Sequence, residues 1–82
     1  RHRVNDPLIR LPPQDRAAER AVLGGLLRDN EAINDVVQII RAENFYFDAH
    51  QKVFLAILEL YNDGIPPDLV TLHDLLRRKA QL

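Results

Sequence analysis

The side chains best suited to chemistry in this 82-residue chain are three histidines. His2, His50 and His73 show no His-x-x-x-His or His-x-x-Glu-His spacing, so no zinc-binding pattern is present. His50 falls on an apolar helix face beside Phe54, which favours a packed, hydrogen-bonded histidine over a metal ligand or a catalytic base. His73 lies near a predicted helix start, and we expect it to be solvated.

The usual catalytic nucleophiles are missing. The chain has no Cys and no Ser, and its single threonine, Thr71, is best explained as a helix cap. A triad-type hydrolase, a disulfide scaffold and a thiolate zinc site are therefore excluded. Gly24-Gly25 lies inside a helical pattern, and no Lys-Ser or Lys-Thr pair exists to complete a phosphate loop. We expect no catalytic residue, no metal and no cofactor in this chain.

Arg77, Arg78 and Lys79 form the strongest basic cluster. They fall in the last turn of a predicted helix, where the helix dipole favours cations, and no aromatic residues interleave with them. The chain carries 11 Lys and Arg against 12 Asp and Glu, a net charge of -1, which argues against a dedicated nucleic-acid surface. No apolar run approaches the ~18–20 residues of a membrane span, so we expect no membrane partner. No signal-peptide pattern is present.

Four amphipathic segments must position these side chains, and no strand pair is indicated. The first helix is predicted to start near Asp15, an N-cap residue that follows two prolines. Gly24 and Gly25 interrupt its apolar stripe, which predicts a close backbone approach or a kink. The stripe itself consists of Val22, Leu23, Leu26 and Leu27.

A second helix is predicted after Asp29-Asn30, and an aromatic connector follows it. The connector, residues 43–47, carries three adjacent aromatic side chains that cannot all point inward, so at least one should stay partly exposed. The second helix is predicted from an apolar stripe at helical spacing, formed by Ile33, Val36, Val37 and Ile40.

The third and fourth helices have clear start signals. Asp48 is predicted to be the N-cap of the third, with Gln51 completing a capping box, and Gly64 to end it in the left-handed conformation. Thr71 is predicted to be the N-cap of the fourth, with Asp74 at N3.

These elements predict an all-α fold: a small orthogonal bundle of about four helices with a short aromatic connector. The bundle should occupy residues 14–82, after an extended or flexible arm in residues 1–13, where Asp-Pro and Pro-Pro steps disfavour helix. A core of this size without disulfides is marginal, so association with a partner is expected.

The order of several residues resembles the N-terminal domain of DnaB-type replicative DNA helicases. The resemblance covers residues 12–82 and rests on the whole ordered set rather than on any single piece. The set is Pro12-Pro13, Glu19, Ala21–Leu27, Phe45-Tyr46, Ala49-His50, Phe54, Ala56-Ile57, Leu60, Gly64 and Pro67–Leu72.

The resemblance implies an all-helical, non-catalytic head of a hexameric ATP-driven helicase. In that family the N-terminal domains pair into a collar above the motor ring and provide docking surface for primase and, in some systems, for other replisome partners such as a helicase loader. ATP, Mg²⁺ and most DNA contacts belong to a separate motor domain. The family domain also continues into further helices, including a hairpin used in pairing and primase docking, and this chain stops before them. The implied location is the bacterial cytoplasm, at the nucleoid and replisome.

The resemblance also assigns expected roles to single residues. Glu19, Gly24 and His50 look architectural, with close packing at Gly24 and a hydrogen-bonded interior contact at His50. Apart from the resemblance, we expect contact surface at Tyr46, Phe47 and the outer face of the second helix. The sequence departs from the family at Arg20, where Gln is frequent, and at Phe47-Asp48, where Arg-Pro is more usual.

An alternative interpretation is a small helix-turn-helix DNA-binding domain. The third and fourth helices would form the pair, with Arg77, Arg78 and Lys79 near DNA. This hypothesis predicts duplex binding that weakens steeply as salt rises. Nothing in the sequence supports a stand-alone enzyme.

Overall fold

The computed structural model describes residues 14–80, and within that range the chain is helical and contains no strand. The helices are α1 (Arg16–Arg28), α2 (Glu31–Val36), α3 (Asp48–Asn62) and α4 (Leu69–Ala80), with a short 3₁₀ turn, η2 (Ala42–Asn44), before α3. The predicted all-α class of about four helices with a short connector is confirmed. The predicted arm, residues 1–13, lies outside the described residues.

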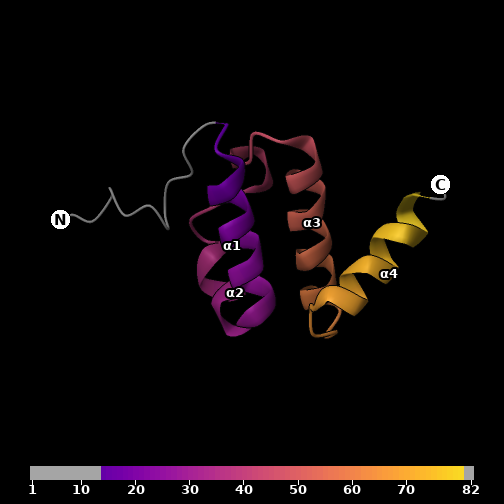
Figure 1. Cartoon of the computed structure of the whole chain (residues 1–82). Coiled ribbons are helices and arrows are strands. Elements are labelled where there is room, and N and C mark those ends of the chain that lie inside the picture. Colours follow the sequence, from indigo (N-terminus) through magenta and orange to yellow (C-terminus); the bar gives the residue numbers. More distant parts are fainter. Residues whose placement is uncertain (1–13, 81–82) are drawn as a thin grey trace.

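The helix α3 is the central element of the fold. It packs against α1, η2 and α4, while α2 packs beneath α1. α1 and α3 lie side by side, the aromatic connector joins the chain across their upper ends, and α4 departs obliquely from the base of α3 (Figure 1). α3 therefore lies between α1 and α4 and packs against both.

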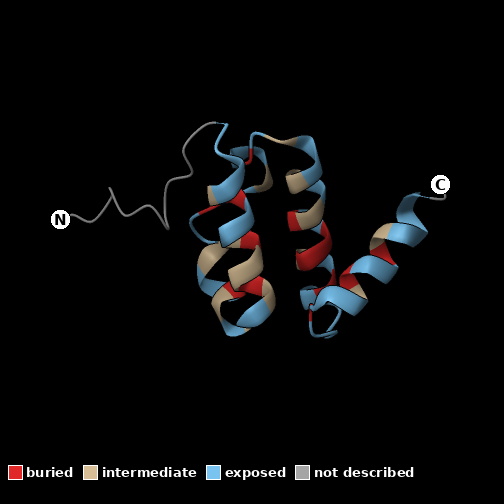
Figure 2. Cartoon of the chain, viewed as in Figure 1, coloured by how far each residue is buried: buried red, intermediate tan, exposed pale blue. Residues whose placement is uncertain are grey.

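The apolar core fills the space between these helices. Buried positions face inward on α1, α3 and the start of α4, whereas the outer helix faces are exposed (Figure 2). Phe45 and Phe54 lie at the centre of the core with their ring centroids 5.1 Å apart. The buried apolar residues are Leu23, Leu26, Ile33, Ile40, Phe45, Phe54, Ala56, Ile57, Leu60, Leu72 and Leu75.

Two of the predicted helix ends are confirmed. The Asp15 side chain accepts a hydrogen bond from the Ala18 amide at 2.9 Å and caps α1. Gly64 has φ +77°, so it adopts the left-handed conformation after α3. The Gly64 amide donates to the Tyr61 carbonyl and the Ile65 amide to the Leu60 carbonyl, a pairing that satisfies the carbonyl groups at the end of the helix.

The predicted N-cap of α3 was wrong by one residue. Phe47, in an extended conformation, is the N-cap, because its carbonyl already accepts the first helical bonds from His50 and Gln51. Asp48 is the first helical residue and pairs with Lys52 at 3.1 Å on the surface. The predicted capping box does not form, since the Gln51 side chain donates instead to the Phe45 carbonyl at 2.7 Å.

The predicted N-cap of α4 was also wrong. α4 begins at Leu69, and the preceding Asp68 forms reciprocal bonds with Thr71, which occupies N3. The Thr71 amide donates to Asp68 Oδ1 at 2.9 Å, and the Asp68 amide donates to Thr71 Oγ1 at 2.9 Å. The predicted start of α4 was too late because Leu69 and Val70, in its first turn, do not belong to the buried apolar stripe.

The helix α2 is shorter than its apolar stripe predicted. It ends at Val36, and turns carry the chain to Ile40, which is still buried. Adjacent β-branched residues lower helix propensity, so packing alone must hold this segment. Asn30 does not cap α2. Its side chain donates to the carbonyls of Leu26 and Pro67, at 2.9 and 3.0 Å, and links the α1–α2 corner to the loop before α4.

The close packing predicted at Gly24 is absent from the described part of the chain. α1 runs through both glycines without a break. A methyl group added at Gly24 would meet only the Arg28 guanidinium, at 3.7 Å, and one added at Gly25 would meet nothing within 4 Å. The prediction failed because the described elements that pack on α1 contact its Leu23 and Leu26 side, whereas the glycines lie away from them.

Candidate functional site

Glu19 is a fully buried carboxylate that joins three elements. It projects from α1 and is 0% exposed. Its Oε2 accepts a hydrogen bond from the Tyr46 amide at 2.6 Å. Its Oε1 lies 2.7 Å from His50 Nδ1 and accepts a longer bond, 3.4 Å, from the Phe47 amide. Glu19 therefore ties α1 to the aromatic connector and to the first turn of α3.

The surroundings of Glu19 favour its charged form. Burial by itself would raise the pKa of Glu19, but the hydrogen bonds from His50 and from the Tyr46 and Phe47 amides, with the charge of His50, lower that pKa below its ordinary value. An ionised carboxylate only accepts hydrogen bonds, so His50 Nδ1 carries the proton of the shared bond. This geometry confirms the hydrogen-bonded interior contact predicted for His50.

This Glu19–His50 pair is suited to holding the fold rather than to proton transfer. A general acid or base must reach the substrate, and Glu19 has no exposed surface. His50 packs edge-on against the Phe47 ring, with centroids 5.5 Å apart. Residues 14–80 contain no group of three His, Asp or Glu side chains that could hold a metal ion.

The two aromatic residues predicted as contact surface differ in exposure. Tyr46 is 56% exposed, which confirms that at least one connector aromatic stays outside the core. Phe47 is half-buried, because the Arg16 guanidinium lies 4.0 Å above its ring centroid and His50 covers another side. Tyr46 remains available to a partner, and its predicted role in an interface stays a prediction.

The basic cluster at the end of α4 is partly neutralised by carboxylates. Arg78 pairs with Asp74 at 3.4 Å, and Lys79 pairs with Glu59 of α3 at 2.9 Å. These pairs lower the net positive charge that the cluster offers to DNA. Within residues 14–80, no helix combines the length and the apolar character needed to cross a bilayer.

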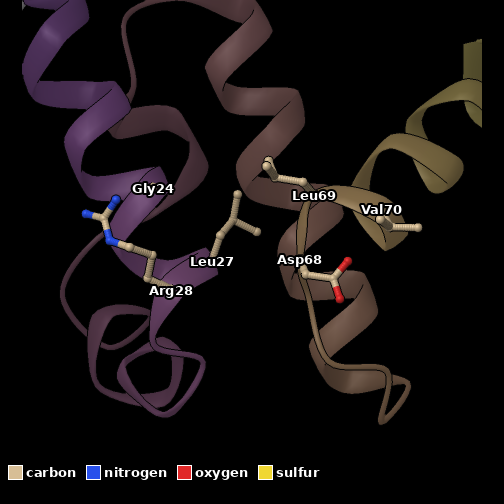
Figure 3. A pocket seen from close by; sticks show the side chains of 6 residues that line it. All are labelled: Gly24, Leu27, Arg28, Asp68, Leu69 and Val70. Carbon is tan, nitrogen blue, oxygen red and sulfur yellow. The ribbon is translucent and has the colours of Figure 1, made fainter.

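Apolar grooves on the surface of the described residues include two that α4 helps to form. The α1/α4 groove lies between the end of α1 and the start of α4 (Figure 3) and is lined by Gly24, Leu27, Arg28, Asp68, Leu69 and Val70. The α3/α4 groove lies in the angle between those helices and is lined by Ala49, Lys52, Val53, Leu55, Ala56, Glu59, Leu76, Lys79 and Ala80. Apolar floors with charged rims are typical of surfaces that bind other proteins.

Sequence reasoning missed the exposed pair Leu69 and Val70. They are 73% and 78% exposed, more than any other large apolar side chain in the described residues. The sequence feature that could have indicated them is an apolar pair at the start of an amphipathic helix, at positions outside its buried stripe.

Comparison with known proteins decides the family. Residues 11–82 match the family model described as the DnaB-like helicase N-terminal domain. The chain belongs to this family. The match covers all the described residues, so the Glu19 network and both grooves are features of a DnaB-like N-terminal domain.

Curated relatives and a solved structure agree with this assignment. The chain is 51% identical over 73 residues to the replicative DNA helicase DnaB of Mycobacterium leprae (strain TN) and 42% identical over 73 residues to that of Leifsonia xyli subsp. xyli (strain CTCB07). Each alignment covers 89% of this chain, and the chain spans only 12% and 16% of those proteins.

The fold matches the crystal structure of the N-terminal domain of DnaB helicase from Mycobacterium tuberculosis. The TM-score is 0.78 at 51% identity, with 84% of this chain and 48% of the other chain covered. The fold of this DnaB-like domain is therefore supported by both sequence and structure.

Proposed function

We propose that this chain is the non-catalytic N-terminal domain of a hexameric, ATP-dependent replicative DNA helicase. In that role it serves assembly of the hexamer collar and docking of primase or other replisome partners, such as a helicase loader, in the bacterial cytoplasm. The observation that carries the proposal is the family match over residues 11–82, whose relatives are replicative DNA helicases.

The physical features of the domain support an assembly role. Glu19, the one buried charge among residues 14–80, is fully used in joining α1, the connector and α3. The α1/α4 and α3/α4 grooves have apolar floors and solvent-exposed rims, which fit binding to protein surfaces better than binding to a nucleotide. ATP, Mg²⁺ and most DNA contacts are assigned, under this proposal, to a separate motor domain.

A chimaera with the Mycobacterium leprae relative tests the proposal. The 73 aligned residues of that helicase are replaced by those of this chain, and hexamer formation, unwinding and binding of the cognate primase are measured. We expect hexamers that unwind DNA and bind primase. A matched control deletes the same segment, and a second carries Glu19→Ala in the transplanted domain.

A chimaera that behaves like the deletion control, with no hexamer and no primase binding, would overturn the proposal. A chimaera that forms hexamers and unwinds DNA but does not bind primase would contradict the docking part of the proposal and leave the assembly part in place. The Glu19→Ala control should resemble the deletion, because it removes the group that joins the three elements.

A further inference from the structure

The α1/α4 groove combines an apolar ridge with an adjacent apolar hollow. The ridge is formed by Leu69 and Val70, 73% and 78% exposed in the first turn of α4. The hollow lies over Gly24 and Leu27 on α1, and Leu27 and Leu69 point toward one another across it (Figure 3). A surface with both a ridge and a hollow can fit a second copy of itself.

No contact within the described fold requires glycine at positions 24 and 25 of α1. Each glycine inside a helix costs about 1 kcal/mol relative to alanine, and neither Gly24 nor Gly25 meets a neighbouring element that would exclude a methyl group. Gly24 lines the groove, and only the Arg28 guanidinium lies near the space that a side chain at this position would fill. Bare backbone lets side chains of another chain approach closely.

The charges at the rim are complementary across a two-fold axis. Arg28 lies on the α1 edge of the groove and Asp68 on the α4 edge (Figure 3). Among the described residues neither forms an ion pair, although Asp68 bonds to Thr71. In a two-fold pair the same patch meets itself, so a contact between Arg28 of one copy and Asp68 of the other is made twice, and both contacts are attractive.

The α3/α4 groove lacks this complementarity. Its rim residues are already paired within the chain: Lys79 with Glu59, at 2.9 Å, and Lys52 with Asp48, at 3.1 Å. A second copy placed there would have to break these pairs or leave its own charges uncompensated.

We propose that the α1/α4 groove is a contact surface for a second copy of this chain. Leu69 and Val70 of each copy pack onto the Gly24–Leu27 strip of the other, and Arg28 of each copy pairs with Asp68 of the other. The inference rests on the proposed function, because it names the surface through which the domain self-associates.

The proposal is tested by charge reversal in sedimentation equilibrium. Arg28→Glu puts two like-charged contacts into its own pair, and Asp68→Lys does the same. An equimolar mixture restores both attractive contacts, because Arg28→Glu supplies two acidic groups and Asp68→Lys supplies two basic groups. We expect each variant alone to dimerise about ten-fold more weakly than wild type, and the mixture to recover wild-type affinity within about three-fold.

Apolar variants provide an independent readout. Val70→Glu should abolish dimerisation while leaving the Asp68–Thr71 cap in place, so it serves even if Asp68→Lys unfolds α4. Leu55→Glu is the matched control, since Leu55 is 54% exposed and lines the other groove. Helix content by circular dichroism accompanies every variant.

Three results would overturn the inference: a wild-type chain that stays monomeric at its highest soluble concentration, a dimer lost in Leu55→Glu but kept in Val70→Glu, or a mixture no tighter than its components. These results are separable from failure of the proposed function. The chimaera would still form hexamers if only the assignment of the surface is wrong, and would fail to form them if the function is wrong.

Discussion

The two halves of α1 have different surroundings in the described fold. In its first half, Glu19 is fully buried and receives three hydrogen bonds from the connector and α3. In its second half, Gly24 and Gly25 face no neighbouring element of the described fold. The first half is explained by the fold of a single chain. The second half buries Leu23 and Leu26 in the core but leaves Gly24 and Gly25 on a face that no described element covers. Under the inference above, this uncovered face is where a second copy of the chain binds.

Glu19→Ala tests the buried half and should have the largest effect. Removing the buried carboxylate costs about 3–5 kcal/mol, because the Tyr46 amide, the Phe47 amide and His50 Nδ1 all lose their acceptor and each unsatisfied buried donor costs about 1–3 kcal/mol. Glu19→Gln keeps one acceptor oxygen and should cost about 1–3 kcal/mol. Urea unfolding followed by circular dichroism measures both. Glu43→Ala, on the exposed η2 turn, is the control and should change stability little. Equal losses at positions 19 and 43 would contradict the account.

The pH dependence of stability tests how much the charge of Glu19 contributes to the free energy of unfolding. Because the pKa of Glu19 is lowered in the folded state below its ordinary value of 4.5, its contribution is present above pH 4.5. That contribution is lost as pH falls below 4.5 through the folded-state pKa. The stability difference between wild type and Glu19→Gln should therefore shrink as pH is lowered from neutral. A difference that stays constant down to acid pH would show that the charge of Glu19 adds nothing.

Alanine at two glycine positions compares the open face of α1 with a turn that needs glycine. Gly64→Ala should destabilise by about 1–2 kcal/mol, because φ is +77° there and a side chain is strained in that conformation. Gly25→Ala should stabilise the monomer by up to about 1 kcal/mol, because alanine favours helix and the space is open. Thermal unfolding at low concentration measures both. A destabilising Gly25→Ala would reveal an internal contact at α1.

The caps give the smallest effects. Asp15→Ala should cost about 1 kcal/mol, since Asp15 accepts the Ala18 amide. Asp48→Ala should cost less than about 0.5 kcal/mol, because it removes only a surface pair with Lys52. Urea midpoints of the two variants, measured side by side, check the order. A larger loss of stability in Asp48→Ala than in Asp15→Ala would indicate that Asp48 caps α3.

The sequence predicted the parts of the fold that depend on local chemistry. The four helices follow from apolar periodicity, and the Asp15 cap and the Gly64 turn follow from single residue types at helix ends. The starts of α3 and α4 were missed because contacts between elements decide them. Phe47 is held by Glu19 from α1, and Asp68 was overlooked because Leu69 and Val70 do not join the buried stripe.

The candidate surfaces were predictable only in part. Tyr46 was expected to be exposed because three adjacent aromatics cannot all be buried, and it is. The α1/α4 groove brings together residues about 40 positions apart, and no local pattern places Gly24 beside Leu69. The resemblance to DnaB-type helicases identified the family but did not indicate which face of the domain pairs.

A concentration series of amide spectra by two-dimensional NMR tests most directly whether the glycine half of α1, and not the Glu19 half, contacts a second copy. It follows both halves of α1 in one experiment. The account predicts that rising concentration shifts the amide signals of residues 24–28 and 68–70 and leaves those of Glu19, Tyr46 and Phe47 unchanged. Shifts at Leu55 and Lys79 in the α3/α4 groove, or no shifts at all, would contradict it.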